Sequence, residues 1–203
     1  MSVNLKHRYT LEEYFEIDRN SEEKYEYWDG EIFLMSGASP EHNEIVFNIA
    51  RELGIQLKKR SCKVFISDQR VKIPAWPPYR YPDLVSLCGK PEYETIGGVA
   101  TLLNPSLVIE ILSPSTEAFD RGDKFSYYKS IPSFCEYLLV AQHRPHITQF
   151  VKQNDNKWLN TEANSLTESL YLPSIDATLL LEEVYLGIEF KEIEIAPPDE
   201  RIV

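Results

Sequence analysis

The sequence predicts an α/β fold of the α+β kind, in which a mixed β-sheet is flanked by helices and preceded by an N-terminal β-hairpin. Asp29-Gly30 lies between strand-like segments at 24–28 and 31–35, and this dipeptide favours a two-residue hairpin turn. Ser39-Pro40 suits the cap and first position of a long helix, whose apolar residues recur at helical spacing as far as Leu57. Segment 106–112 is almost wholly apolar, as expected of a central strand covered on both faces.

The rest of the chain alternates short structured segments with turns. Thr10 and Glu13 have the spacing of a capping box at the start of a short helix. We expect further strands at 63–66, 70–73, 82–87, 136–140 and 146–151, and further helices at 120–130 and 179–186. A loop rich in proline and tryptophan should occupy 74–81. Strands that alternate with helices in this order predict a mixed sheet with helices packed against it.

The length of 203 residues suits one domain. We assign residues 1–191 to this domain and residues 192–203, which include Pro197-Pro198, to a C-terminal tail. No stretch reaches the roughly 18 apolar residues of a membrane-spanning helix. The first residues are polar and lack the apolar centre of a signal peptide. We therefore expect a cytoplasmic protein without a membrane partner.

The net charge of −11 argues against tight nonspecific binding to DNA. Such affinity comes mainly from lysine and arginine side chains that contact phosphates, and an acidic surface repels phosphates at long range. Two arrangements are compatible with nucleic-acid chemistry despite this charge. One is a local basic groove, and the other is a carboxylate cluster that a divalent metal ion neutralises.

The three cysteines predict neither a disulfide nor a zinc site. Cys62, Cys88 and Cys135 are odd in number, lie far apart and form no CxxC motif. We expect them to be small buried hydrophobic residues.

Two carboxylates stand out because of where they fall in predicted strands. Glu110 is the charged residue inside the apolar strand 106–112, where an unpaired carboxylate is costly. It therefore either pairs with a cation in the core or emerges at an active site and holds a metal ion. Asp83 follows Pro82 at the start of another apolar strand and is either a turn residue or a ligand. Two carboxylates on adjacent strand ends suit Mg²⁺, which binds a few carboxylate oxygens and several waters.

The chain resembles one family over about residues 9–190. The residues that carry the resemblance are Tyr25-Glu26, Asp29-Gly30-Glu31, Met35-Ser36, Ser39-Pro40, His42, Tyr81-Pro82-Asp83, Val108-Ile109-Glu110, Leu112-Ser113-Pro114-Ser115-Thr116, Asp120, Lys124, Tyr128 and Glu136-Tyr137. Together they are similar to a large bacterial family of predicted restriction endonucleases in the PD-(D/E)xK nuclease superfamily. Many members of that family have unknown function. The resemblance implies a restriction-endonuclease-like core.

The resemblance also assigns roles to the two carboxylates. The superfamily's first aspartate maps to Asp83, and its acidic residue on the next strand maps to Glu110. The superfamily's lysine belongs two residues later, where this chain has Leu112. Lys124, at the start of the next helix, is our candidate for a replacement cation that orients the attacking water or stabilises charge on the phosphate. The alternatives for Lys124 are an exposed helix lysine or a partner for Asp120 four residues earlier.

Further residues have weaker assignments. Glu26 is a candidate third metal ligand, or it bridges across its hairpin, and His42 either touches the site or caps and packs. Glu44 is more consistent with a solvated helix face than with a site. His143 and His146 flank a turn and should not share a metal ion. Trp76, Tyr79 and Tyr81 suit stacking on bases, but we expect them to cover the core.

The predicted function is hydrolysis of phosphodiester bonds in DNA by a magnesium-dependent endonuclease, with Mg²⁺ or Mn²⁺ held by Asp83 and Glu110, and by Glu26 as a further ligand. A homodimer is expected because superfamily endonucleases often pair to cut two strands. One alternative is a catalytically inactive nuclease-fold binding module that acts through a protein or nucleic-acid partner. Another is a hydrolase of small phosphorylated or nucleotide substrates, which would keep the metal ion without a DNA groove.

Overall fold

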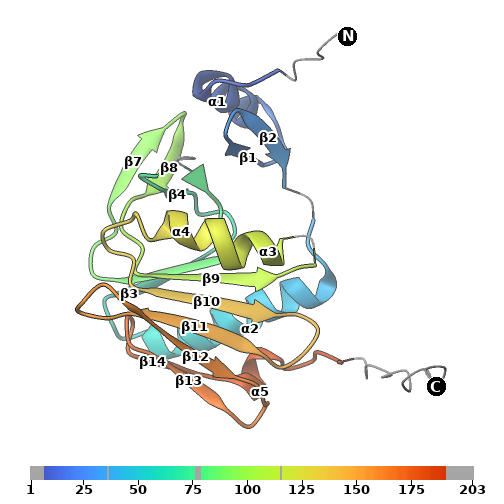
Figure 1. Ribbon diagram of the computed structural model, residues 1–203, viewed down its shortest axis with the longest axis vertical. Coiled ribbons are helices and arrows are strands. Elements are labelled where there is room, and N and C mark those ends of the chain that lie inside the picture. Colours follow the sequence, from blue (N-terminus) through green and yellow to red (C-terminus); the bar gives the residue numbers. More distant parts are fainter. Residues whose placement is uncertain (1–6, 36, 76–78, 115, 191–203) are drawn as a thin grey trace, which may run out of the picture.

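The computed structural model describes residues 7–35, 37–75, 79–114 and 116–190. At its centre is a six-stranded sheet in the order β12-β11-β10-β9-β6-β3 (Figure 1). Its strands are β3 (Cys62–Ile66), β6 (Leu84–Cys88), β9 (Leu107–Leu112), β10 (Glu136–Ala141), β11 (Ile147–Lys152) and β12 (Trp158–Ala163). β9 and β10 pair in parallel and the other neighbours pair antiparallel, which confirms the predicted mixed sheet.

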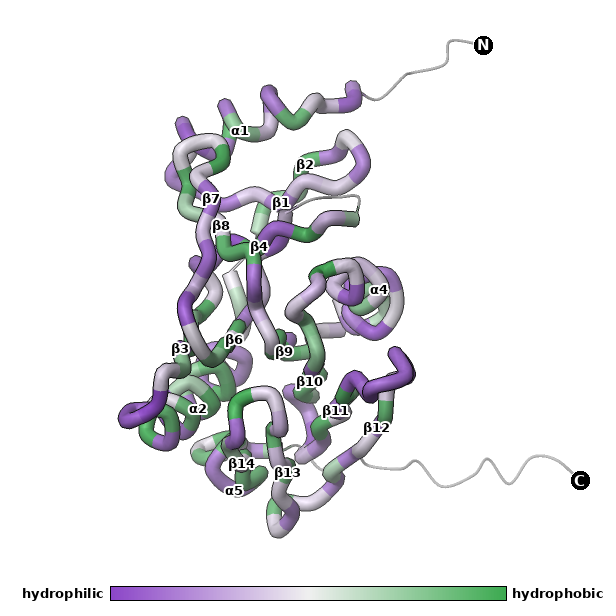
Figure 2. The backbone as a smooth tube through the Cα atoms, turned by 90° about the vertical axis from the view of Figure 1, so that its left-hand side faces the viewer, coloured by the Kyte–Doolittle hydropathy of each residue, from purple (hydrophilic) through white to green (hydrophobic). Residues whose placement is uncertain are grey.

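Helices cover both faces of this sheet. One face carries α2 (Pro40–Leu57), together with β13 (Ser169–Leu172), β14 (Ala177–Leu180) and α5 (Leu181–Val184). The other face carries a helical segment made of α3 (Glu117–Phe119), the π-helical turn η1 (Asp120–Lys124) and α4 (Phe125–Tyr128). Successive strand residues point to opposite faces, so Ile109 packs beneath α2 whereas Val108 packs beneath α4. Figure 2 shows that β9 is largely hydrophobic, as a strand covered on both sides must be.

The N-terminal elements lie above this sheet in Figure 1, beside a smaller four-stranded sheet. They are α1 (Leu11–Asn20), β1 (Tyr25–Trp28) and β2 (Glu31–Leu34), and the smaller sheet contains β4 (Val71–Lys72), β5 (Tyr79–Arg80), β7 (Tyr93–Ile96) and β8 (Val99–Leu102). Buried Arg70 joins the two parts. Its Nη1 lies 3.3 Å from Asp18 Oδ2 on α1, and its Nε donates to Thr101 Oγ1 on β8 at 2.9 Å.

The turn and cap signals in the sequence are confirmed. Trp28 pairs with Glu31, and Asp29 and Gly30 between them have φ values of 41° and 81°, the positive values that a tight two-residue hairpin turn requires. Thr10 and Glu13 form the expected capping box at α1. Ser39 caps α2 by accepting a hydrogen bond from the His42 backbone.

Other sequence-based assignments are wrong or incomplete. The predicted helix at 179–186 is instead the end of β14 followed by α5, because a short apolar run fits a strand and a helix equally well. The loop predicted at 74–81 contains β5, and its residues 76–78 lie outside the described ranges. β7, β8, β12 and β13 were not predicted. Most residues of β7 and β12 are exposed and give little hydrophobic signal, and β8 and β13 are only four residues long.

The expectation about cysteines is also wrong. Cys62 and Cys88 face each other in the antiparallel register of β3 and β6, with Cα atoms 3.9 Å apart, and form a disulfide. Cys88 is exposed, and Cys62 and Cys135 are half-buried, so none of them is a fully buried core residue. A spacing of 26 residues does not reveal this pairing, because only the register of two strands brings the thiols together.

None of the helices in the described ranges is both long and apolar enough to cross a membrane. The tail assigned to 192–203 lies outside those ranges.

The disulfide predicts a definite thiol count. In the denatured, unreduced protein an alkylating reagent should label Cys135 alone, and all three cysteines should react after reduction. Cys62→Ser should lower the free energy of unfolding by about 3 kcal/mol, because the open chain gains conformational entropy when unfolded. Mass spectrometry and urea unfolding measure the two effects. Cys135→Ser is the matched control, and equal labelling of all cysteines before reduction would contradict the pairing.

Candidate functional site

Asp83 and Glu110 meet where β6 begins beside β9. Leu84 pairs with Ile109 in the antiparallel register, which sets the preceding Asp83 opposite Glu110. Asp83 Oδ2 accepts a hydrogen bond of 2.7 Å from the backbone nitrogen of Ile111, so the carboxylate is fastened to the neighbouring strand. The two carboxylates predicted from the sequence are therefore adjacent in space.

Glu110 lies in a tightly enclosed environment. It is 2% exposed, and its Oε1 accepts hydrogen bonds from Tyr128 Oη at 2.7 Å and from Lys124 Nζ at 2.9 Å. Burial raises the pKa of Glu110 to about 8. The Lys124 charge opposes this rise, and the nearby charges of Asp83 and Asp120 add to it. Glu110 is thus a buried carboxyl whose ionised form depends on the Lys124 cation.

Lys124 reaches Glu110 from the helical segment that covers the same face of the sheet. Its Nζ lies 2.9 Å from Glu110 Oε1 and 3.1 Å from Asp120 Oδ1. Burial by itself would lower the pKa of Lys124, but the charges of Glu110 and Asp120 outweigh burial and raise it, so the side chain is a cation. Of the alternatives, an exposed helix lysine is excluded, and pairing with Asp120 coexists with pairing to Glu110.

Leu112 explains why the lysine comes from a helix. It lies two residues after Glu110, faces the same side of the sheet, and is buried among Val108, Phe125 and their neighbours. A lysine there would replace an apolar contact of the core. The lysine from η1 reaches the same carboxylate from outside the sheet, and π-helical turns of this kind frequently mark functional sites.

His42 and Glu26 lie at the edge of the carboxylate pair. His42 Nε2 is 3.2 Å from Asp83 Oδ2, so His42 touches the site as well as following the cap of α2. Glu26 Oε1 accepts a 3.3 Å hydrogen bond from the backbone nitrogen of Tyr81. The alternative in which Glu26 bridges its own hairpin is thus replaced by a bond to the segment that precedes Asp83.

Arg80 is a site residue that the sequence analysis missed. Its side chain is 1% exposed, and Nη1 donates to the carbonyl oxygens of Tyr27 at 2.9 Å and Tyr79 at 3.0 Å. The guanidinium carbon lies 4.8 Å from the ring centre of Trp28 and 5.7 Å from that of Phe119. Its place three residues before Asp83 is the one signal in the sequence that points to it.

Gln142 was also missed. It lines the same cavity and directly follows β10. Its Nε2 donates to the carbonyl oxygen of Leu112 at 2.8 Å, and its Oε1 accepts from Ser39 Oγ at 2.8 Å. Gln142 therefore ties the start of α2 to the end of β9.

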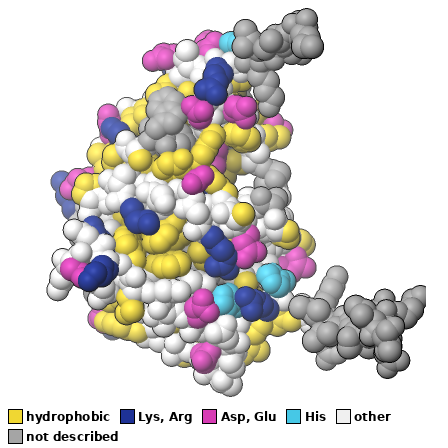
Figure 3. Space-filling view, in the orientation of Figure 1, with side chains coloured by type: hydrophobic (Ala, Val, Ile, Leu, Met, Phe, Trp, Pro, Cys, Tyr) yellow, Lys and Arg dark blue, Asp and Glu magenta, His cyan; other side chains and the backbone are white. Residues whose placement is uncertain are grey.

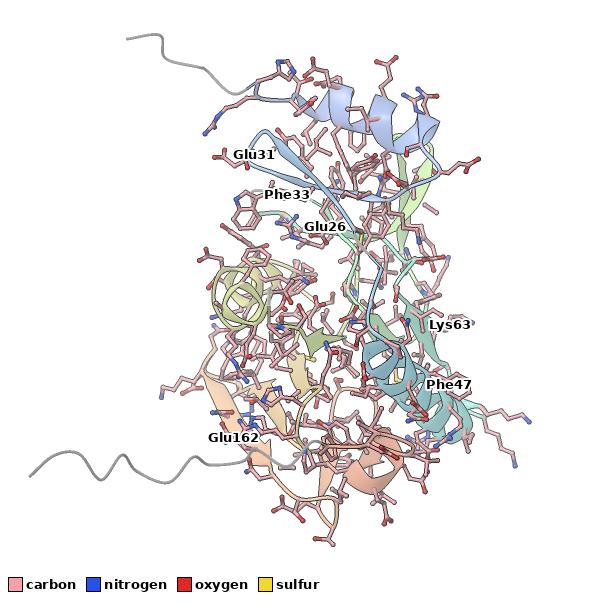
Figure 4. All side chains as sticks on the ribbon, turned by 90° about the vertical axis from the view of Figure 1, so that its right-hand side faces the viewer. Glu26, Glu31, Phe33, Phe47, Lys63 and Glu162 are labelled. Atoms are coloured by element: carbon pink, nitrogen blue, oxygen red, sulfur yellow. A yellow bond between two sulfur atoms is a disulfide. The ribbon has the colours of Figure 1, made fainter. Side chains whose placement is uncertain are left out.

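These side chains line one cavity of about 750 Å³. Its polar part contains the acidic pair, and its apolar part comes largely from the β1–β2 hairpin and from α3. The lining includes Glu26, Trp28, Phe33, Leu34, His42, Arg80, Asp83, Glu110, Phe119, Asp120, Lys124 and Gln142. In Figure 4, Glu26 and Phe33 extend from the hairpin, whereas Phe47 extends from α2 on the outer side of the molecule.

The donor set fits a magnesium ion that keeps most of its water. Within the described part of the chain, no three His, Cys, Asp or Glu side chains are close enough to form a ready-made metal site. Mg²⁺ commonly needs one or two carboxylates. Asp83 Oδ1 and Glu110 Oε2 have no hydrogen bond or ion pair to other described residues. Glu26 lines the same cavity outside any such cluster, so its role as a ligand stays a prediction.

The histidines and aromatic residues outside this pair behave as expected. His143 is exposed, and buried His146 is hydrogen-bonded to Asn164 and Thr148, so the two do not share a site. Tyr79 and Tyr81 are buried, and Glu44 is exposed on α2. Trp76 lies outside the described residues.

A mixed sheet flanked by helices, with two carboxylates on neighbouring strands and a lysine from the covering helix, defines a restriction-endonuclease-like domain. The sequence model of the Uma2 family, described as "putative restriction endonuclease", matches residues 11–181. The chain belongs to this family.

Relatives and a solved structure agree with this classification. The uncharacterized protein sll1609 of Synechocystis sp. (strain ATCC 27184 / PCC 6803 / Kazusa) is 37% identical over 153 residues, which cover 75% of this chain and 86% of the relative. The uncharacterized protein slr1290 of the same strain is 33% identical over 181 residues, with coverages of 88% and 92%. A crystal structure of a "putative nuclease belonging to DUF820" from Anabaena variabilis has a TM-score of 0.69 at 17% identity and covers 87% of this chain and 97% of its own. The fold is therefore nuclease-like.

The buried pair of Lys124 and Glu110 predicts a non-additive effect on stability. Lys124→Met should lower the free energy of unfolding by about 3 kcal/mol or more, because it leaves buried carboxylates without a cation. Adding Glu110→Gln should restore part of this loss. Urea unfolding of both single variants and the double variant measures the coupling. Lys58→Met, at the exposed C-terminal end of α2, is the control, and purely additive effects would contradict the pairing.

Proposed function

We propose that this protein is an endonuclease that hydrolyses phosphodiester bonds of DNA with Mg²⁺ or Mn²⁺ bound at Asp83 and Glu110. The observation that carries the proposal is the convergence of three groups on one cavity. Asp83, directly before β6, lies opposite Glu110 on β9, and Lys124 lies 2.9 Å from Glu110. The family to which the chain belongs is described as "putative restriction endonuclease", which supports hydrolysis of phosphodiester bonds as the reaction.

Each residue has a distinct part in this proposal. Asp83 is oriented by the backbone of Ile111, so that its second oxygen remains available to a ligand. Glu110 offers Oε2 in the same way while Lys124 and Tyr128 hold Oε1. When bound, the metal ion lowers the pKa of a water and offsets charge on the phosphate. Lys124 orients that water or stabilises charge at the scissile phosphate.

The acidic surface is compatible with a nuclease role when a bound divalent metal ion attracts the phosphates of the substrate to the site. The face seen in Figure 3 intersperses basic and acidic side chains without a continuous basic stripe. A divalent ion between Asp83 and Glu110 removes the local repulsion that phosphate would otherwise meet. The predicted homodimer remains a proposal alongside the reaction.

A second candidate is a catalytically inactive nuclease-fold module that binds a protein or nucleic acid. Two observations favour it. Glu110 already has an internal cation, Lys124, and Leu112 occupies the strand position where the superfamily has its lysine. A binding module in which Lys124 neutralises Glu110 should have no affinity for a metal ion at Asp83 and Glu110. A measurement of metal binding therefore separates the two candidates.

The enzyme proposal predicts cleavage that depends on both carboxylates. Purified protein should nick or cut supercoiled plasmid in the presence of Mn²⁺ or Mg²⁺, and chelation should stop the reaction. Asp83→Asn and Glu110→Gln should each reduce the rate by about a hundredfold or more, since each removes a metal ligand. Glu44→Gln, on the exposed face of α2, is the control for charge. Full activity of either site variant would refute the assignment.

The raised pKa of Glu110 predicts that metal affinity depends on pH. Below a pKa of about 8 the carboxyl holds a proton that the metal ion must displace. Affinity for Mn²⁺ should therefore rise about tenfold per pH unit up to roughly pH 8 and then level off. Calorimetry in buffers of different ionisation enthalpy should detect the released proton. Glu110→Gln should remove the dependence, and a constant affinity between about pH 6 and pH 8 would contradict it.

A further inference from the structure

Arg80 has hydrogen-bond donors that the described chain leaves unsatisfied. Its Nε and Nη2 are buried and have no hydrogen-bond partner among the described residues, although the side chain is only 1% exposed. A buried charged donor without an acceptor is costly, and most such groups in folded proteins are satisfied. These two atoms therefore require an acceptor that the described residues do not supply.

The protein fixes the guanidinium through Nη1, which also forms a long ion pair with one carboxylate, and leaves Nε and Nη2 without a partner among the described residues. Nη1 is held by the carbonyl oxygens of Tyr27 and Tyr79, which carry no net charge. The carboxylate nearest to Nη1 is Glu26, whose Oε2 lies 4.0 Å away, while its Oε1 accepts from the Tyr81 backbone. The rings of Trp28 and Phe119 pack against the guanidinium, which restricts its rotation. Arg80 is thus an oriented cation with two free donors on one side.

Arg80 lies in the wall of the cavity that contains the two carboxylates, Asp83 and Glu110. The other basic residues of the described lining are Lys124, which is bound by Glu110 and Asp120, and His42, which is bound by Asp83. Of the arginine and lysine side chains in this described lining, Arg80 is therefore the one that keeps hydrogen-bond donors available for an anion. A guanidinium offers paired N–H groups that match the oxygens of a phosphate.

The apolar part of the cavity supplies a surface for a base. Phe33 on β2 lines the cavity and is 47% exposed, in contrast to the buried aromatic residues of the core. Exposed aromatic rings stack on nucleobases with little preference for sequence. The cavity volume of about 750 Å³ is within the range of sites that enclose a ligand of nucleotide size.

We infer that Arg80 and Phe33 form a subsite for one nucleotide of a single DNA strand next to the bond that is cut. Arg80 Nε and Nη2 bind a backbone phosphate, and Phe33 stacks on the base. This inference rests on the proposed nuclease function and extends it, since it assigns a positioning contact beyond the metal-binding pair. It also implies that the strand enters the cavity unpaired, because a base that stacks on Phe33 is not stacked in a duplex.

Binding of a labelled single strand tests the inference without turnover. The probe is a fluorescein-labelled oligothymidine of about 12 nucleotides, with Ca²⁺ in place of Mg²⁺ and anisotropy read over a series of salt concentrations. Arg80→Met should weaken binding about tenfold and lower the salt dependence by about one phosphate contact. Arg80→Lys should recover part of the affinity. Phe33→Ala should weaken binding by about tenfold without changing the salt dependence.

Arg51→Met and Phe47→Ala are the matched controls. Arg51 is on α2 and pairs with Glu183, and Phe47 is 64% exposed on the same helix; neither lines the cavity. Strands that carry a single uncharged methylphosphonate linkage provide a second measurement that needs no unstable variant. One linkage should weaken binding to the wild type, and the same linkage should have little effect on Arg80→Met.

The outcomes separate this inference from the nuclease proposal. If Arg80 and Phe33 variants melt like the wild type and bind the strand as tightly as the controls do, the subsite is wrong even if Asp83 and Glu110 prove catalytic. The same conclusion follows if no single methylphosphonate weakens binding. If Arg80-dependent binding persists in a protein that neither binds Mn²⁺ nor cuts DNA, the subsite stands and the nuclease proposal fails.

Discussion

The buried ion pair between Lys124 and Glu110 is the interaction on which the arrangement of the site depends. A carboxylate in the middle of an apolar strand is tolerated because a cation and the Tyr128 hydroxyl meet its Oε1. The pair also joins β9 to the helical segment that covers it. The sheet thus fixes one partner and the helix fixes the other, so the site cannot lose this contact without loosening the packing of both.

Strand pairing then determines where the second carboxylate lies. Asp83 directly precedes β6, and the register of β6 against β9 brings it beside Glu110. Its bond to the Ile111 nitrogen continues the hydrogen-bonding pattern of the two strands by one step. The acidic pair is therefore a consequence of the most regular part of the fold, whereas the basic residues around it come from helices and from the edge of a smaller sheet.

The sequence predicted the parts of this site that have a local signal. Glu110 is conspicuous because it interrupts an apolar strand, and Asp83 because it follows a proline at a strand start. Lys124 was chosen from its place after that strand, and the structure brings it to Glu110. The mixed sheet and the capped helices were likewise predicted from periodicity and from turn residues.

What the sequence did not predict depends on tertiary register. Arg80 acquires its surroundings from Trp28 and Phe119, which are distant in sequence, and Gln142 acquires its bonds from Ser39 and Leu112. The pairing of Cys62 with Cys88 depends on a strand alignment that spacing does not encode. Short exposed strands such as β7 and β12 were missed because few of their residues are buried.

The two hydrogen bonds of Gln142 have a mechanical consequence. By connecting Ser39 with Leu112, this amide fastens the first turn of α2 to the sheet and keeps His42 at a set distance from Asp83. The start of α2, the end of β9 and the residue that follows β10 are thereby connected to one another. The β1–β2 hairpin is connected to the same centre, because Glu26 accepts a hydrogen bond from the Tyr81 nitrogen and the Tyr27 carbonyl accepts one from Arg80. A displacement of the hairpin would therefore be transmitted to the segment that precedes Asp83.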